Sequence, residues 1–273
     1  MNEFDLNQAN CHEDSLVKKY TAELSTNLNL TPLITVITVS FNAVNVIEKS
    51  ISSVISQSYS NIEYIVIDGQ STDGTLDVLK RYESKIDYLV SEKDCGIYDA
   101  MNKAIDNSTG EWLYFLGADD HFSDQYVIGD VVREVINSKL KLNLVFGNVK
   151  TDDGKLVKSI FGAKLLLHNC LHHQSCFYSR DLFDGFRYDI SNKIISDYEL
   201  NLISYIEKKN ALKMDRVIAV CCVGGISNNK ENYCIHINET NSIRKRHVNV
   251  CFNIVLQAIF NAKALIHYVI RYF

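Results

Sequence analysis

The stretch Gly110-Glu-Trp-Leu-Tyr-Phe-Leu-Gly-Ala-Asp-Asp120 joins a short apolar run to two adjacent carboxylates. Strands favour aromatic and branched apolar residues and are poor in Asp, so residues 112–116 are predicted to form a buried strand. Two neighbouring Asp side chains repel each other unless a cation or a hydrogen-bond donor shares them. Oxygen ligands suit Mg²⁺ or Mn²⁺. A simple turn that begins at Asp119 and Asp120 is the alternative, and the sequence upstream favours a metal site.

Two predicted strands upstream also end in polar loops. Residues 33–40 are almost continuously β-branched, which is typical of a strand buried on both faces of a parallel sheet. Residues 62–67 have a similar character and are followed directly by Asp68. Ligands of open α/β sheets bind at the carboxyl ends of the strands. We therefore expect three polar loops to meet at one rim of the sheet, namely residues 40–42, 68–73 and 119–120.

Helices are predicted between these strands, at residues 44–57, 75–82 and 97–107. The alternation of strand and helix predicts an α/β fold with an open, mostly parallel sheet flanked by helices. Further elements are expected after Asp120. They are a helix over 126–139, a strand over 144–149, a hairpin around 152–154, a helix that starts near Ser196 and a strand over 217–223.

The composition is that of a soluble globular protein, with 47% hydrophobic and 22% charged residues in a chain of 273. A formal net charge of −5 gives no broad basic face, so nucleic acid is not expected among the partners. Residues 1–29 are polar and acidic, whereas a secretory signal has an apolar core. The eight cysteines form no CxxC pair, so we expect reduced thiols in a cytoplasmic protein.

Taken in order, these stretches resemble the inverting family-2 glycosyltransferases, which have the Rossmann-like GT-A fold. The resemblance is dense from Pro32 to Asp120 and looser from Leu171 to Ser227. The stretches that carry it are Thr35-Val-Ile-Thr-Val-Ser-Phe-Asn42, Ile65-Val-Ile-Asp-Gly-Gln-Ser-Thr-Asp-Gly-Thr75, Asp94-Cys-Gly-Ile-Tyr-Asp-Ala-Met-Asn-Lys-Ala-Ile105, residues 110–120, His173-Gln174 and Ser196-Asp-Tyr-Glu-Leu200. The resemblance implies a nucleotide-sugar donor, with a UDP-sugar preferred.

The resemblance also implies roles on the donor side. The nucleotide-binding residues would be Ser40, Asn42, Asp68 and Asp119, with Asp68 holding uracil or ribose and Asp119 touching ribose or the donor sugar. Asp120 would bind Mn²⁺ or Mg²⁺ that bridges the diphosphate. Gly117 stands where the family motif often has an earlier Asp, so fewer carboxylates are available to the metal here.

On the acceptor side, Asp197 matches the position of the general base, and His173 with Gln174 matches an acceptor-binding His-Gln motif. In an inverting transfer the acceptor hydroxyl attacks the anomeric carbon opposite the leaving diphosphate, while a carboxylate removes its proton. The alternative role of Asp197 is to cap the helix that follows it, with Ser196 as a competitor for that cap. Glu199 is the second candidate for the base.

The resemblance predicts an inverting enzyme that moves a sugar to a hydroxyl of a saccharide or lipid-linked saccharide in surface polysaccharide or O-antigen synthesis. Two other classes stay open. A nucleotidyltransferase also uses strand-end carboxylates with metal, although residues 41–47 lack the glycine and lysine that grip a triphosphate. A saccharide-binding relative without activity is the other, although the four carboxylates that the resemblance singles out are present.

The end of the sequence combines the basic cluster Arg244-Lys-Arg-His247 with an apolar stretch, residues 248–270. Polar residues recur every four positions in this stretch, which predicts an amphipathic helix. Such a helix would lie in the plane of an anionic membrane, on the inner face of the cell membrane, or would pack on the enzyme or on a second subunit of a homo-oligomer. We therefore divide the chain into a polar leader (1–31), a GT-A domain (32–243, with a donor half over 32–122 and an acceptor half over 123–243) and a C-terminal helix (244–273).

Overall fold

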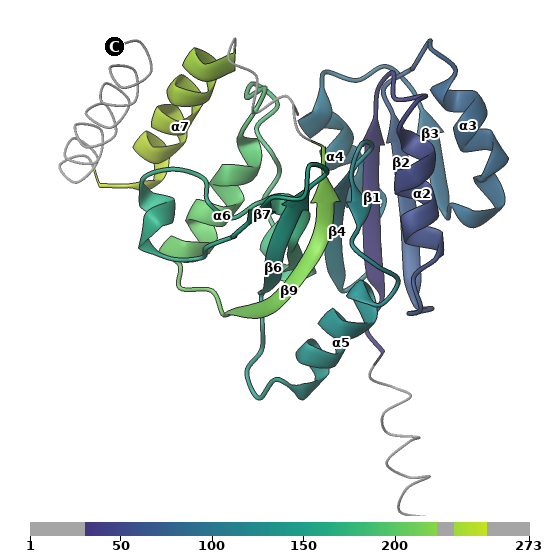
Figure 1. Cartoon of the computed structure of the whole chain (residues 1–273). Helices are drawn as coiled ribbons and strands as arrows, with labels where there is room; N and C mark the ends of the chain where they lie inside the picture. Colours follow the sequence, from purple (N-terminus) through teal and green to yellow (C-terminus); the bar gives the residue numbers. More distant parts are fainter. Residues whose placement is uncertain (1–30, 223–231, 250–273) are drawn as a thin grey trace, which may run out of the picture. The chain divides into compact units, whose positions relative to one another are not determined.

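The computed structural model describes residues 31–222 and 232–249 (Figure 1). Contacts divide the chain into Met1–Pro32 and Leu33–Phe273, and the elements below belong to the second unit. The strands are β1 (Ile34–Ser40), β2 (Ile62–Asp68), β3 (Tyr88–Ser91), β4 (Trp112–Gly117), β5 (His121–Phe122), β6 (Leu144–Thr151), β7 (Leu156–Val157), β8 (Cys176–Ser179) and β9 (Ala211–Cys221). The α-helices are α2 (Ile47–Ile55), α3 (Thr75–Arg81), α4 (Ile97–Asn107), α5 (Val127–Asn137), α6 (Ser196–Ile206) and α7 (Tyr233–His247). Short 3₁₀ turns are η1 (Glu83–Lys85), η2 (Ala163–Leu166), η3 (His173–Ser175) and η4 (Arg180–Phe183).

The strands form a single mixed sheet in the order β3-β2-β1-β4-β8-β6-β9-β5, and β7 pairs with β6. The first four strands in this order are parallel, as the alternation of strand and helix predicts. Ser40 lies opposite Asp68, and Asp68 lies opposite Ser91, so the carboxyl ends of β1, β2 and β3 are level. This register confirms that the polar loops after β1 and β2 share one rim of the sheet.

Beyond β4 the sheet departs from the parallel arrangement. β8 pairs antiparallel with both β4 and β6, and β5 pairs antiparallel with β9. The predicted hairpin after β6 is confirmed, but its returning strand is only Leu156–Val157. β9 starts at Ala211, before its predicted start at 217. Its first half carries Lys213, Asp215 and Arg216 and has no fully buried residue, so it lacks the continuous apolar run from which the strand was predicted.

Side chains alternate between the two faces of the sheet and build two separate cores. Ile37 and Val39 of β1 contribute to the core that includes α4, α6 and α7. Ile34 and Val36 of the same strand contribute to the core that includes α2, α3 and α5. In Figure 1, α2 and α3 lie beside β1 and β2, whereas α6 and α7 lie beyond β6 and β9. The helices therefore cover both faces, as an α/β fold requires.

The basic cluster at 244–247 forms the last turn of α7, and its residues contact the rest of this unit. Arg244 is fully buried, and Arg246 and His247 both bind Glu199 of α6. Helix α7 continues through the predicted boundary between 243 and 244. The apolar stretch that follows lies outside the described residues from 250 onward. Among the helices that the structure describes, none is both long and apolar enough to cross a membrane.

Candidate functional site

The donor-side rim is organised around the carboxylate of Asp68, which is completely buried at the end of β2. Its Oδ1 accepts hydrogen bonds from the hydroxyls of Ser40, at 3.0 Å, and Ser71, at 2.5 Å. Its Oδ2 accepts from the Ser71 amide, at 3.0 Å, and from the Ser91 hydroxyl, at 2.6 Å. Asp68 thus ties the ends of β1, β2 and β3 together, and it can contact a nucleotide only if one of these serine donors turns away.

The loops after β1 and β2 are also joined directly to each other. Asn42 has a φ of 50°, a left-handed conformation that Asn tolerates better than most residues. The backbone amide of Asn42 donates a hydrogen bond to the Ser71 hydroxyl at 2.8 Å. The side-chain Oδ1 of Asn42 accepts one from the backbone amide of Thr72 at 2.9 Å. Asp73 accepts two hydrogen bonds from Thr75, the first residue of α3, one from its amide and one from its hydroxyl. Asn42 therefore holds the two rim loops in place.

Asp119 and Asp120 follow the end of β4, and their carboxylates turn back towards Gly117. A Cβ on Gly117 would lie 2.6 Å from Asp120 Oδ2 and 3.0 Å from Asp119 Oδ1. Because a side chain at this position would displace both carboxylates, the glycine explains how the pair can fold back on the strand end. Position 117, where the family motif often has an earlier Asp, therefore has no room for a side chain while the two carboxylates fold back in this way.

The environment of Asp120 resists a lone negative charge. The side chain is 4% exposed, and burial raises the pKa of Asp120, with the charge of Asp119 raising it further. The Cys222 amide donates to Asp120 Oδ1 at 3.3 Å, and Gln174 donates a side-chain hydrogen bond to the carboxylate. A buried carboxylate beside an exposed one fits a divalent cation that keeps part of its coordination for substrate phosphates. Within residues 31–222 and 232–249, no three acidic, His or Cys side chains gather to enclose a metal by themselves.

Asp197 lies at the start of α6 and is buried, with 7% of its surface exposed. Asn169 Nδ2 donates to its Oδ2 at 2.9 Å, and His173 Nδ1 lies 3.4 Å from the same oxygen. The Tyr98 hydroxyl donates to Oδ1 at 3.4 Å. Burial raises the pKa of Asp197, but the hydrogen bonds and the charge of His173 outweigh it and leave the pKa below its usual value. The carboxylate is therefore ionised at neutral pH.

The contacts in the structure bear on the two alternatives given above, a capping role for Asp197 and a base role for Glu199. Neither Asp197 nor Ser196 caps α6, because Asp197 binds the three side chains just named and the Ser196 hydroxyl donates to the Asp189 carbonyl. Glu199 accepts hydrogen bonds from Arg246, at 3.0 and 2.8 Å, and lies 2.5 Å from His247 Nε2. Glu199 is thus paired with the basic side chains of α7, whereas Asp197 is paired with His173, whose pKa is also raised by the charges of Asp120 and Asp119.

His173 stands between the two groups of carboxylates. Burial alone would lower the pKa of His173, but the hydrogen bond and charge of Asp197, followed by the charges of Asp120 and Asp119, leave it above its usual value. The adjacent residue, Gln174, reaches Asp120. The predicted acceptor-side pair therefore joins the predicted base to the predicted metal ligands in one cluster.

Several members of this cluster were not predicted. Tyr98 lies within a stretch that carries the family resemblance, but no role was assigned to it. Asn169 precedes Asp197 by 28 positions, and nothing in the local sequence connects the two. The Cys222 amide reaches Asp120 from the end of β9, which the sheet alone brings to this rim. Backbone donors of this kind leave no signal in side-chain patterns.

His173→Gln should shift the pH dependence of turnover. Removing the imidazole takes away the charge and the hydrogen bond that hold down the pKa of Asp197, so burial then raises that pKa. A base works only when it is deprotonated, and the acidic limb of kcat/KM should therefore move to higher pH. Rates measured across the pH range for both proteins test this, and an acidic limb that stays in place would contradict it.

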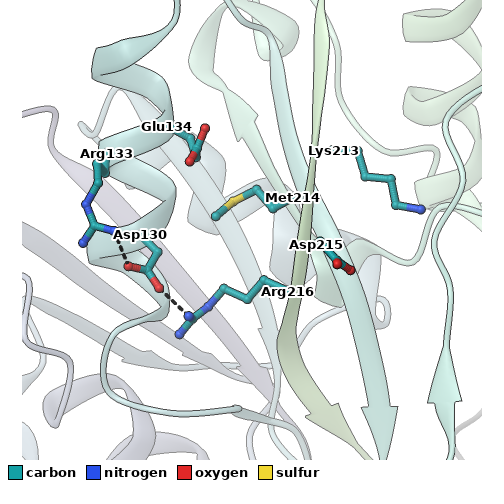
Figure 2. Close-up of a pocket in the computed structure, with 7 residues that line it drawn as sticks. All are labelled: Asp130, Arg133, Glu134, Lys213, Met214, Asp215 and Arg216. Atoms are coloured by element: carbon teal, nitrogen blue, oxygen red, sulfur yellow. Dashed lines mark hydrogen bonds and ion pairs between the residues drawn. The ribbon is translucent and has the colours of Figure 1, made fainter.

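A separate hollow of about 390 Å³ lies between α5 and β9 (Figure 2). Three of its charged residues form ion pairs: Arg133 lies 3.0 Å from Asp130, and Arg216 binds Asp130 as well as Asp124 outside the hollow. Gly147 of β6 faces the bulged segment of β9, and its Cβ would lie 2.4 Å from the Arg216 carbonyl oxygen. None of the residues that line this hollow belongs to the cluster of Asp119, Asp120, His173, Gln174 and Asp197.

Comparison with known sequences places this chain in a family. The sequence profile described as Glycosyl transferase family 2 matches residues 35–183. A PGL/p-HBAD biosynthesis glycosyltransferase of Mycobacterium bovis is 28% identical over 205 residues, which cover 72% of this chain and 80% of that protein. A putative teichuronic acid biosynthesis glycosyltransferase, TuaG of Bacillus subtilis, is 41% identical over 95 residues, which cover 34% of this chain and 38% of TuaG.

Solved structures share the fold at lower identity. The crystal structure of S. aureus TarS 1–349 in complex with UDP-GlcNAc matches with a TM-score of 0.65 and 15% identity, over 83% of this chain and 71% of that one. The mannosyltransferase PcManGT from Pyrobaculum calidifontis, in complex with GDP-Man and Mn²⁺, matches with a TM-score of 0.60 and 19% identity, over 84% and 69%. The fold expected from the resemblance is confirmed, and the chain belongs to glycosyl transferase family 2, as a glycosyltransferase with a GT-A fold.

Proposed function

We propose that this glycosyltransferase is an inverting enzyme that moves a sugar from a UDP-sugar to a hydroxyl of a saccharide or lipid-linked saccharide, in the synthesis of a surface polysaccharide or O-antigen. The observation that carries the proposal is the state of Asp197. It is a buried, ionised carboxylate that caps no helix and that is joined through His173 and Gln174 to the strand-end pair Asp119 and Asp120. A proton acceptor and a diphosphate-binding rim thus lie in one cluster.

The proposed donor site lies along the rim formed by the ends of β1, β2 and β4. Ser40, Asn42 and Asp68 hold the nucleotide-side loops, and Asp119 is exposed beside them for contact with ribose or the donor sugar. The choice of a uridine nucleotide is supported by the structures of TarS, which contain UDP-GlcNAc in one case and UDP in the other. TuaG, which is named for teichuronic acid biosynthesis, supports a role in polysaccharide biosynthesis.

Asp120 would hold a Mn²⁺ or Mg²⁺ ion in this site. Its carboxylate fits such an ion because Mg²⁺ sites usually combine one or two carboxylates with substrate phosphates. The ion, when bound, would offset the negative charge that builds up on the leaving diphosphate. The Mn²⁺ complex of PcManGT supports this assignment by its fold alone.

The chemical step follows from the position of Asp197. The acceptor oxygen attacks the anomeric carbon and forms the new glycosidic bond, while the bond to the UDP oxygen breaks and both electrons leave with UDP. Asp197 takes the hydroxyl proton. His173 and Asn169 stabilise the ionised form of its carboxylate before the transfer. Attack from the side opposite the leaving group inverts the anomeric configuration.

A panel of nucleotide sugars tests the donor. The chain is mixed with each UDP-, GDP- and TDP-sugar in the presence of Mn²⁺, and thermal unfolding and release of free nucleotide are measured. A ligand that binds only the folded state raises the Tm. We expect a UDP-sugar to give the largest rise and to be turned over slowly to UDP. A larger effect from a GDP- or TDP-sugar would overturn the choice of uridine.

We also propose that the enzyme works at the cytoplasmic face of the membrane, held there by the amphipathic pattern of residues 248–270. The test is sedimentation with phosphatidylglycerol vesicles at low salt, comparing the full chain with a chain that ends at Asn249. The shortened chain keeps α7 and its contacts to α6, so it should bind UDP normally but stay in the supernatant. Equal sedimentation of both chains would contradict the anchor.

A further inference from the structure

The backbone just before Asp197 is held by a side chain from a different helix. Glu239 of α7 accepts hydrogen bonds from three consecutive amides, those of Lys193 at 2.6 Å and of Ile194 and Ile195 at 3.1 Å each. These amides precede α6, whose N-cap residue Ile195 makes no side-chain cap hydrogen bond. Amides at a helix start need partners, and a carboxylate is a favourable one there because of the helix dipole. Glu239 thus fixes the backbone that leads directly into α6.

The same helix also holds the residue two positions after Asp197. Arg246 donates two hydrogen bonds to the oxygens of Glu199, and His247 approaches one of them. Two parallel bonds between a guanidinium and a carboxylate fix orientation as well as distance. Arg246 also lies 3.3 Å from Asp189, at the start of the loop that leads to α6. Helix α7 therefore grips the chain on both sides of Asp197.

These contacts matter because the position of Asp197 is otherwise set by long-range partners. Its carboxylate meets Tyr98 of α4 and Asn169 in the loop after η2. Neither partner fixes the backbone from which the carboxylate projects. A shift of that backbone would lengthen these hydrogen bonds and move the base away from its substrate. Misplacement by about 1 Å can cost as much as 10²-fold in rate.

We propose that α7 is the positioning element of the base, and that Glu239 is its principal positioning residue, holding residues 193–195 so that Asp197 faces the acceptor. The proposal rests on the proposed function of Asp197. Glu239 has no role in donor binding on this view, because its hydrogen bonds go to the backbone before α6 and not to the donor-side rim. Its loss should therefore change kcat and leave the KM of the donor alone.

The test compares Glu239→Ala and Glu239→Gln in the full chain, with Lys245→Gln as control. Lys245 is exposed on the same helix, so its replacement by Gln changes the net charge of the chain by one unit at a site away from α6. We expect Glu239→Ala to lower kcat about tenfold, with the donor KM within about twofold of the wild-type value. Glu239→Gln keeps one acceptor oxygen and should lose less. Hydrogen exchange of the 193–197 amides should quicken in the same order, and Lys245→Gln should change neither quantity.

The outcomes separate this proposal from the proposed function. Unchanged exchange of the 193–197 amides in Glu239→Ala, or a rise in donor KM with kcat preserved, would overturn the positioning role of Glu239 and leave the proposed function standing. A wild-type chain that transfers sugar from no nucleotide sugar would overturn the proposed function instead. In that case the exchange rates alone still decide whether Glu239 anchors the segment.

Discussion

Asp197→Asn should lower the rate of sugar transfer by about 10²-fold or more, which is the usual scale for loss of a general base. The amide has nearly the same shape as the carboxylate, so the hydrogen bond from Tyr98 to Oδ1 can be kept, but it cannot accept the acceptor proton. UDP binding should stay close to that of the wild type, because Asp197 does not touch the donor-side rim. The two quantities are measured by steady-state rates and by calorimetric titration with UDP.

Glu207→Gln is the matched control for this change. Glu207 follows the end of the same helix, and within the described residues its carboxylate has one ion pair, an exposed one with Lys209. Its loss should leave both transfer and UDP binding as they are. If Asp197→Asn lost UDP binding together with turnover, Asp197 would be a structural residue of α6 and the base would have to be sought elsewhere.

Asp120→Ala should abolish metal-stimulated transfer and remove the dependence of UDP binding on Mn²⁺. The change deletes the buried member of the strand-end pair, and Asp119 alone is exposed and leaves fewer oxygen ligands for a cation. Folding should not suffer, because burial and the charge of Asp119 both raise the pKa of Asp120, which means that its charged form is destabilised in the folded chain. UDP affinity measured with and without Mn²⁺ shows the effect.

Asp77→Ala serves as the control for Asp120→Ala, because Asp77 is an exposed carboxylate on the surface of α3. It should leave the Mn²⁺ dependence of UDP binding unchanged. Normal metal-stimulated turnover in Asp120→Ala would show that Asp120 is not a metal ligand. The role of the strand end after β4 would then be limited to shaping the rim.

The donor half of the fold could be predicted because its signals are local. Each parallel strand there is a short β-branched or aromatic run, and each ends in a polar loop at the rim that parallel pairing creates. The predicted helix over 97–107 is confirmed at both ends. The family match also decides between the predicted classes, since it confirms a glycosyltransferase and not a nucleotidyltransferase or an inactive relative.

The second half of the fold depends on contacts between distant parts of the chain. The antiparallel entry of β8 between β4 and β6 cannot be deduced from Cys176–Ser179 alone, because a run of four buried residues suits either direction of pairing. The same holds for the site. The contacts of Asp197 with Asn169 and His173 cannot be deduced from its local sequence, because neither residue is its neighbour along the chain.

The contacts of the basic cluster at 244–247 also could not be predicted from the sequence. Four consecutive basic residues favoured a membrane-facing patch by charge alone. In the structure Arg246 and His247 bind Glu199, and Arg244 is buried, so most of this charge is directed towards the protein. Only Lys245 of the four is exposed without a charged partner among the described residues. Charge patterns cannot show which side of a helix the partner occupies.

The stereochemistry of the first product tests the inverting mechanism without knowledge of the acceptor. The donor found in the nucleotide-sugar panel, if its sugar is α-linked, is incubated with the enzyme and Mn²⁺ until water acts as the acceptor, and the released sugar is followed by ¹H NMR before it mutarotates. Asp197 acting as a base opposite the leaving UDP gives the β-anomer first. Release of the α-anomer first would contradict an inverting transfer.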